Sequence, residues 1–160
     1  MDKNVIKEVQ VGASNFRIKR FDASTGSWLL MTLMGEMQKA LSDLPTVDKP
    51  AVELSDEEKQ AAEENAATGA IQFLLMNLDE EKFTKIQMKA LAVCEVSKFI
   101  GEKEVWLPLI DGKRITNFEL QSDVSTIMTL TSQSLFANLS PFFSKNGLSQ
   151  IFSPQVVSQE

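Results

Sequence analysis

The sequence predicts a mainly α-helical protein: a single small helical domain with a short β-hairpin at its N-terminus and a second short hairpin before its last helix. Three observations support this fold class. Long segments carry apolar residues at three- and four-residue spacing, clean alternation is confined to short segments, and 43% hydrophobic with 24% charged residues is typical of a globular protein. Of the 160 residues, we expect 1–146 to form the domain and 147–160 to form a frayed tail.

The first element is a predicted β-hairpin. Residues 5–11 alternate loosely between apolar and polar side chains, and residues 16–21 (FRIKRF) alternate cleanly. The residues between them, GASN, are typical of a turn. Two short strands joined by such a turn indicate a hairpin.

A helix is predicted over residues 22–44. Asp22 or Ser24 can accept hydrogen bonds from the free N–H groups of its first turn, and Pro45 ends it. Its apolar residues recur at helical spacing and form a broad stripe. They are Trp28, Met31, Leu33, Met34, Met37, Ala40, Leu41 and Leu44.

Residues 45–56 are predicted to form a loop or flexible linker, because they contain prolines and show no hydrophobic period. A second helix is predicted to follow, since Ser55 and Glu58 have the spacing of a capping box. The first half of this helix is acidic and rich in alanine, which favours a solvated face over a site for a basic partner. The helix becomes apolar only from Ala70 onward.

A third helix is predicted over residues 78–99. Asp79 can cap its first turn, two glutamates follow directly, and Gly101 lies just beyond its end. Cys94 lies inside this predicted helix, and no neighbouring residue would activate its thiol. We therefore expect Cys94 to be a small buried hydrophobic residue and not a nucleophile.

A second hairpin is predicted around Asp111 and Gly112, because an Asp-Gly dipeptide favours a tight turn. Pro108 lacks a backbone N–H and confines its strand to the edge of a sheet. The last helix is predicted to begin near Ser122 or Asp123. Its inward face follows helical spacing through Val124, Ile127, Met128, Thr131, Leu135, Leu139 and Phe142.

Composition limits the partners and the compartment. A formal net charge of -6 opposes binding to nucleic acid or to an anionic membrane surface, since both depend on Lys and Arg. We find no apolar run long enough for a signal peptide or a membrane span. A single cysteine excludes an intrachain disulfide. We therefore expect a cytoplasmic protein that binds neither nucleic acid nor membranes.

The absence of histidine and tyrosine restricts the chemistry that the chain can perform. A Ser-His-Asp or Cys-His arrangement is excluded, and the commonest general base and nitrogen metal ligand are missing. Carboxylate or magnesium chemistry remains open on composition alone. The acidic residues, however, cluster on a polar helix without the spacing of a metal-binding loop. We expect no enzymatic activity, no cofactor and no metal site.

Five residues are candidates for a partner-binding surface. Met31, Met34 and Met37 share one predicted helix at three-residue spacing, and methionine side chains repack around different partners. Phe142 and Phe143 are adjacent at a helix end, where they point about 100° apart, so one ring can remain outside the core as an anchor. The alternative for all five is that they fill the core, as apolar residues at helical spacing usually do.

The order of the parts adds a further signal. A short β segment ends in F-x-A before an apolar helix, a helical middle follows, and the last helix finishes in N-L-x-x-F-F. In this order the sequence resembles the tail assembly chaperones of long-tailed bacteriophages over most of its length, with residues 45–69 fitting least well. The segments that carry the resemblance are FRIKRFDASTGSWLLMTLMGEM (16–37), VWLPLIDGK (105–113) and FELQSDVSTIMTLTSQSLFANLSPFF (118–143).

This resemblance implies a mainly helical, non-catalytic protein of the host cytoplasm. It implies binding to the tape measure protein, the long helical chain that sets tail length. Several copies of the chaperone, as a possible homo-oligomer, would coat that chain, keep it soluble and bring tail tube subunits to it. The residues alone leave two other classes open: a structural virion component such as a tail tube or connector subunit, and a carboxylate or magnesium enzyme.

Overall fold

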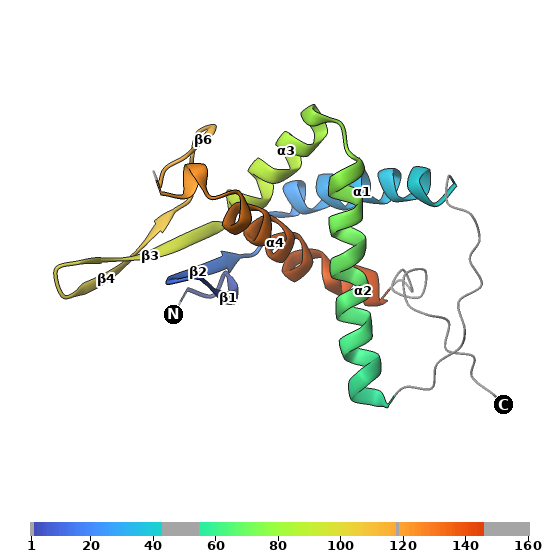
Figure 1. Ribbon diagram of the computed structural model, residues 1–160, viewed down its shortest axis with the longest axis horizontal. Coiled ribbons are helices and arrows are strands. Elements are labelled where there is room, and N and C mark those ends of the chain that lie inside the picture. The colour runs from blue at the N-terminus through green and yellow to red at the C-terminus, as the bar shows by residue number, and fades with distance from the viewer. Residues whose placement is uncertain (1, 43–54, 118, 146–160) are drawn as a thin grey trace.

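The computed structural model describes residues 2–42, 55–117 and 119–145. Residues 45–54 of the expected loop and the whole expected tail, 147–160, lie outside the described residues. A four-stranded sheet occupies one end of the molecule, the helices occupy the other, and the last helix runs between them (Figure 1). The elements are β1 (Val5–Val11), β2 (Ser14–Lys19), α1 (Ala23–Ser42), α2 (Asp56–Asn77), α3 (Glu80–Leu91), β3 (Cys94–Ile100), β4 (Lys103–Pro108), β5 (Ile110–Asp111), β6 (Arg114–Ile115), the 3₁₀ turn η1 (Leu120–Ser122) and α4 (Val124–Lys145).

This is a mixed α/β fold, so the prediction of a mainly α protein is wrong. The error lies in residues 94–108, whose first half we assigned to the third helix. Helix α3 ends at Leu91, and the chain continues as β3, which turns back through Gly101 into β4. The β-branched and aromatic residues of β3 favour a strand. Gly101 has a φ of +66°, a backbone conformation that glycine adopts at little cost.

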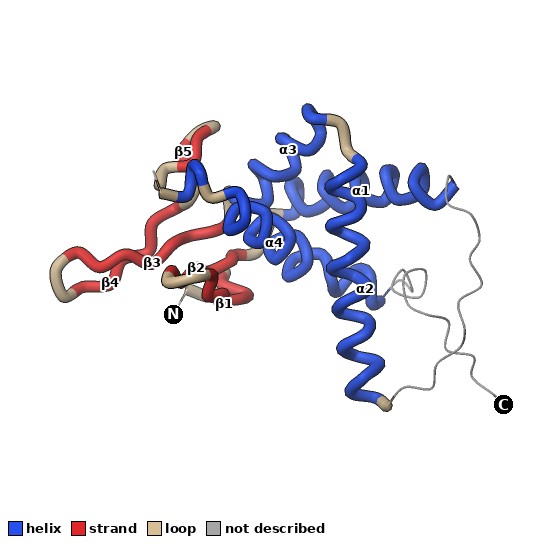
Figure 2. The backbone as a smooth tube through the Cα atoms, in the orientation of Figure 1, coloured by secondary structure: helices blue, strands red, loops and turns tan. Residues whose placement is uncertain are grey.

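The sheet has the strand order β1-β2-β3-β4, and neighbouring strands are antiparallel (Figure 2). The expected N-terminal hairpin is confirmed as β1–β2, with its turn at Gly12. Strand β2 then pairs with β3 in the register Phe16↔Val96 and Ile18↔Cys94, although α1, α2 and α3 separate the two strands in sequence.

The second expected hairpin is confirmed in part. Asp111 pairs with Arg114 across a turn at Gly112, which forms the small β5–β6 hairpin. The strand that ends at Pro108, which we expected to belong to this hairpin, pairs instead with β3 as strand β4. Strand β4 does lie at an edge of the sheet, which is the place that a proline allows.

Helix α4 joins two hydrophobic cores. Its first half covers one face of the sheet through Ile127 and Leu130, and its second half packs among the other helices through Leu135 and Leu139. The sheet core consists of Phe16, Ile18, Leu91, Cys94, Val96, Leu109, Leu120, Ile127 and Leu130. The helical core consists of Phe21, Leu29, Leu33, Met37, Ile71, Leu74, Leu75, Ile86, Ala90, Leu135 and Leu139.

The expected helix caps are confirmed. Asp22 caps α1, Asp79 caps α3 through the backbone N–H of the third helical residue, and Asp123 caps α4. At the start of α2 the Glu58 N–H donates to Ser55 Oγ at 3.3 Å, and the Ser55 N–H donates to Glu58 Oε2 at 2.9 Å. This reciprocal pair is the capping box that the sequence predicted.

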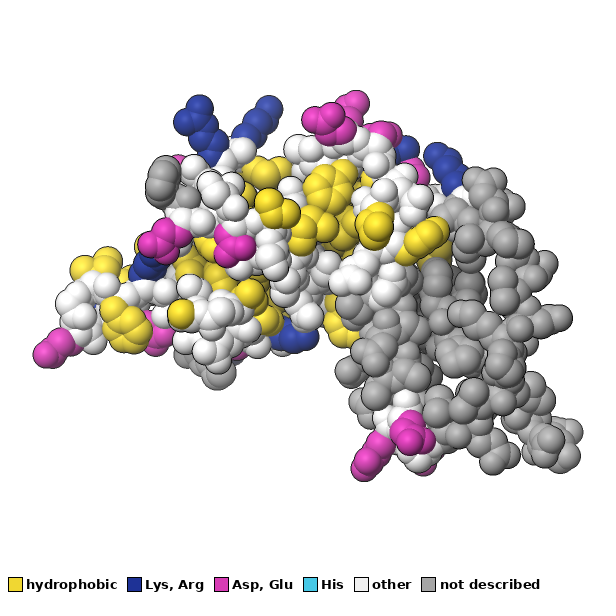
Figure 3. Space-filling view, viewed as in Figure 1, with side chains coloured by type: hydrophobic (Ala, Val, Ile, Leu, Met, Phe, Trp, Pro, Cys, Tyr) yellow, Lys and Arg dark blue, Asp and Glu magenta, His cyan; other side chains and the backbone are white. Residues whose placement is uncertain are grey.

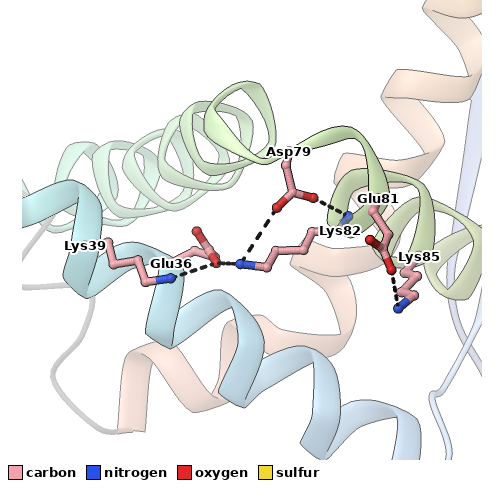
Figure 4. A network of polar contacts seen from close by, with 6 residues as sticks. All are labelled: Glu36, Lys39, Asp79, Glu81, Lys82 and Lys85. Carbon is pink, nitrogen blue, oxygen red and sulfur yellow. Dashed lines mark hydrogen bonds and ion pairs between the residues drawn. The ribbon is translucent and has the colours of Figure 1, made fainter.

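Charged side chains link α1 to α3. Glu36 Oε1 lies 2.6 Å from Lys82 Nζ and 3.6 Å from Lys39 Nζ, and Lys82 Nζ also lies 3.9 Å from Asp79 Oδ2 (Figure 4). The hydrogen bond from Lys82 lowers the pKa of Glu36, so its carboxylate stays ionised. The network therefore holds the two helices together on the side away from the sheet.

The face of the sheet that α4 does not cover is polar. Glu95 accepts hydrogen bonds from Lys19 Nζ at 2.7 Å and from Arg17 Nε. The Arg17 guanidinium also lies over the ring of Trp106 on β4, 4.6 Å from its centroid. These contacts connect β2, β3 and β4. An antiparallel sheet typically has one apolar face and one polar face, as this sheet does.

Candidate partner-binding groove

An apolar groove lies between the start of α1 and the end of α4, next to β1. Its volume is about 750 Å³. Leu30 on α1, Ile6 on β1, and Pro141 and Phe142 on α4 supply large apolar side chains to its walls. We call this site the groove; it is lined by Ile6, Arg20, Phe21, Asp22, Ala23, Gly26, Ser27, Leu30, Ala137, Asn138, Leu139, Pro141 and Phe142.

Asn138 fixes the two walls of the groove relative to each other. Its Oδ1 accepts a hydrogen bond from the Phe21 N–H at 2.8 Å, and its Nδ2 donates to the Lys19 and Ser134 carbonyls at 3.1 Å each. One side chain of α4 thus binds the segment that connects β2 to α1. All three contacts are partly buried, so we expect them to hold the groove open at a fixed width.

Small residues form the α1 wall of the groove. Ala23, Gly26 and Ser27 place little side-chain volume at the start of this helix. At Gly26, a Cβ atom would approach the Cβ of Phe21 to 3.6 Å, an ordinary van der Waals distance. The α1 wall of the groove is therefore shallow because these side chains are small, and not because the backbone is unusual.

The positively charged side chain of Arg20 lies at the rim of the groove. Arg20 is exposed, and in the part of the chain that the structure describes no carboxylate forms an ion pair with its guanidinium. Asp22 is close in sequence, but Thr25 engages both of its oxygens, at 2.8 Å each. The backbone N–H and hydroxyl of Thr25 lower the pKa of Asp22. Arg20 is therefore available to an acidic group on a partner.

The five predicted binding residues fall in different environments. Phe142 is 47% exposed and lines the groove, and Met31 is 69% exposed on α1 outside it. Met34 is half-buried, one turn beyond Leu30. Met37 is 4% exposed and belongs to the helical core, as the alternative interpretation expected for it. The side chain of Phe143 lies outside the described residues.

Sequence reasoning missed several residues of the groove, chiefly Ile6, Arg20 and Leu30. Ile6 and Arg20 lie in the two segments predicted as strands, and Leu30 was absent from the apolar stripe assigned to the first helix. No local pattern marks them as a site, because they meet only once β1, α1 and α4 are packed. Phe142 was the one groove residue that its position at a helix end did indicate.

Further exposed apolar side chains lie on the helices outside the groove. Met76 on α2 is 81% exposed, Phe73 is 42% exposed, and Trp28 on α1 is 37% exposed with Lys89 over its ring. Figure 3 shows hydrophobic side chains at the surface where α2, α3 and α4 approach one another, and further ones on the β3–β4 hairpin. Within the described residues no helix is long and apolar enough to cross a membrane.

Four aspartates outside the acidic start of α2 lie at helix starts or in the β5–β6 hairpin. Asp22, Asp79 and Asp123 each cap a helix. Asp111 lies in the β5–β6 hairpin. Among the side chains that the structure describes, no group of three or more Cys, Asp or Glu residues is arranged to hold a metal ion.

The chain belongs to the family of phage tail assembly chaperones. Residues 12–150 match the family model described as phage tail assembly chaperone protein, TAC, which confirms the resemblance seen in the sequence. The matched range includes helices α1, α2, α3 and α4 and most of the groove. No match was found among curated proteins or among solved structures. The role that the family indicates is assistance in tail assembly, which is not an enzymatic one.

Proposed function

We propose that this chaperone binds apolar helical segments of the tape measure protein in the groove during tail assembly. By covering these segments in the host cytoplasm it keeps the tape measure protein soluble, and several copies bound along it help to recruit tail tube subunits. The observation that carries the proposal is an open apolar groove with an exposed aromatic residue, Phe142, at its edge.

The dimensions of the groove suit the side chains of a helix. A volume of about 750 Å³ lies within the range of roughly 300–1,000 Å³ that is usual for ligand pockets. A helix bound in such a groove inserts residues from one face, at three- and four-residue spacing. Leu30 and Phe142 on opposite walls would contact these residues, and Met31 and Met34 lie on the same helix as Leu30.

Charge supports the same role. The net charge of -6 keeps a complex with an aggregation-prone partner dispersed. Arg20 at the rim favours segments in which an acidic residue lies beside the apolar anchors, because the guanidinium lacks an ion-pair partner among the described residues.

Co-expression with the tape measure protein of the same phage tests the proposal. We expect the chaperone to raise the soluble yield of the tape measure protein and to copurify with it. Purified phage particles should contain no stoichiometric amount of the chaperone, as they would if it were a tail tube or connector subunit. Unchanged solubility together with no copurification would overturn the proposed function.

A further inference from the structure

Among the described residues, no strand pairs with the outer edge of β4. The strand order places β4 next to β3 and at the end of the sheet, and the β3–β4 hairpin extends away from the helices (Figure 1). Phe99 and Ile100 near its tip are 70% and 67% exposed. An open edge presents unpaired backbone groups to any strand that can lie beside it.

The register of the hairpin identifies which backbone groups point outward. Ile100 pairs with Lys103 across a two-residue turn that begins at Gly101, so their backbone groups face each other. Hydrogen-bonded and non-hydrogen-bonded pairs alternate from there along an antiparallel ladder. The N–H and C=O groups of Glu104 and Trp106 therefore point away from β3, toward the open edge.

The side chains of Glu104 and Trp106 lie over the face of the sheet, where they contact β3 and β2. Glu104 Oε1 accepts a hydrogen bond from the Ser97 hydroxyl on β3 at 2.6 Å. Arg17 on β2 lies 4.6 Å from the ring centroid of Trp106. Neither the carboxylate nor the indole therefore covers the outward backbone groups.

The apolar face of the sheet continues onto β4 beyond the cover of α4. Leu107 is the register partner of the buried Val96 but is itself 41% exposed. Val105 lies two residues from Leu107 on the same face and is half-buried. The strand thus combines free backbone groups with an uncovered part of an apolar face.

We propose that two copies of this chain pair through β4, antiparallel, about a two-fold axis at Val105. Glu104 of one copy lies opposite Trp106 of the other, and their outward backbone groups form four hydrogen bonds between the copies. Val105 meets Val105, and Lys103 lies opposite Leu107. The two four-stranded sheets become one continuous sheet, with their apolar faces on the same side.

Other registers of the pairing between the two β4 strands are less favourable. Matching the two apolar faces allows shifts of two residues only. An axis at Glu104 would place two carboxylates opposite each other, which is destabilising. An axis at Trp106 would place Pro108, which has no N–H, in a hydrogen-bonding position opposite Glu104. Lys103 and Pro108, residues that discourage strand pairing, lie at the ends of the paired segment when the axis is at Val105.

This interface is independent of what the groove binds. None of the residues that line the groove lies in β3 or β4. A pair of copies would therefore present two grooves on one rigid sheet, which raises the avidity for a long partner with repeated binding segments.

Cross-linking of the full chain tests the register. In the variant Val105→Cys the two new thiols face each other at a non-hydrogen-bonded pair, with Cα atoms about 4.5 Å apart, which suits a disulfide. We expect it to form a covalent dimer on mild oxidation. The single variants Lys103→Cys and Leu107→Cys should remain monomeric on a non-reducing gel, whereas the double variant should cross-link. Cys94 is fully buried and does not compete. Equal cross-linking of all variants, or none, would overturn the register.

The mass in solution tests the interface itself. By light scattering or sedimentation equilibrium we expect the wild-type chain to dimerise with rising concentration. Val105→Lys, which places two ammonium groups opposite each other, should shift the dimer dissociation constant upward at least tenfold. Val124→Lys, the same change at a 73% exposed position on α4, should leave it unchanged. A wild-type monomer at every concentration, or a dimer that Val105→Lys does not weaken, would refute the proposal. Copurification of Val105→Lys with the tape measure protein reports on the groove separately.

Discussion

The Asn138 carboxamide accepts a hydrogen bond at 2.8 Å from the backbone N–H of Phe21, a residue 117 positions earlier in the chain. Phe21 lies in the connection between β2 and α1, so this contact links the start of the first helix to the last helix. The same side chain also donates to Lys19, at the end of β2. Sheet, first helix and last helix therefore meet at one amide group.

Replacing Asn138 should destabilise the fold. Asn138→Ala removes three hydrogen bonds and leaves the Phe21 N–H and the Lys19 carbonyl without this partner, which costs about 2 kcal/mol in the free energy of unfolding. Urea unfolding followed by circular dichroism measures the change. Asn77→Ala is the matched control, because the exposed Asn77 donates to the Phe73 carbonyl of its own helix and, among the described residues, to no other element. Equal losses for the two variants would contradict this role of Asn138.

A charge in the groove should weaken binding of the tape measure protein. Phe142→Asp places a carboxylate at an edge that is 47% exposed, so the fold should survive while copurification falls at least tenfold. Met76→Asp makes the same change at an 81% exposed position outside the groove and should have little effect. The reverse result would assign binding to the helical surface around Met76.

The contribution of Glu95 to stability should depend on pH. Burial alone would raise the pKa of this carboxyl, but hydrogen bonds from Lys19 and Arg17 outweigh burial and hold the pKa below its usual value. A folded-state pKa below the unfolded value, about 4.3 for Glu, stabilises the fold above that pH. The stabilisation is lost as the pH falls through the folded-state pKa.

We therefore expect Glu95→Gln to lower the free energy of unfolding by about 1 kcal/mol near neutral pH and by a smaller amount near about pH 3. Denaturant titrations at both pH values provide the measurement. Glu119→Gln, at an exposed position, serves as the control. A destabilisation of Glu95→Gln that is the same at both pH values would rule out the ion pairs as its source.

Replacing Gly35 and Gly101 with alanine should change the stability of the protein in opposite directions. Gly35 lies inside α1, and a Cβ there would contact nothing within 4 Å, so Gly35→Ala should stabilise the protein by about 0.5–1 kcal/mol. Gly101 has a φ of +66° in the β3–β4 turn, and Gly101→Ala should destabilise it by about 1 kcal/mol or more. Thermal melts of both variants beside wild type check the signs. A shift in the same direction would contradict the backbone argument.

The Cys94 thiol should be inert in the folded protein. It is fully buried in the sheet core, and burial raises its pKa to about 12. Since the thiolate is the reactive form, alkylation at mildly alkaline pH should be negligible in the native state and fast in denaturant. Mass spectrometry after a timed reaction measures this. Labelling of the native protein as fast as labelling of the denatured chain would contradict the burial of Cys94.

Local signals predicted the local parts of the fold. The caps Asp22, Ser55 and Asp79 were visible because a cap needs only a polar residue before a helical pattern. The Asp111–Gly112 turn was visible for a similar reason. Strand β3 was missed because a short apolar run directly after a helix is compatible with both helical and strand periodicity. Its pairing with β2, which decides the matter, is not local.

The candidate site was less predictable than the fold. The three methionines of the first helix were grouped by their three-residue spacing, but each such step turns the helix by about 60° short of a full turn. Met37 therefore points about 120° from Met31, which explains why one is in the helical core and the other is 69% exposed. The walls of the groove depend on how α1 and α4 pack, and Asn138 gave no sign of its role in the sequence.

The groove has a consequence for the order of events during translation. Its walls come from segments that lie far apart in the sequence, with Ile6 on β1, Arg20 just after β2 and Phe142 on α4. A nascent chain on the ribosome therefore lacks the groove until α4 has left the exit tunnel. Molecules in which α4 has not yet packed against α1 have no groove, so the proposed binding of a partner there requires that α4 has emerged and folded.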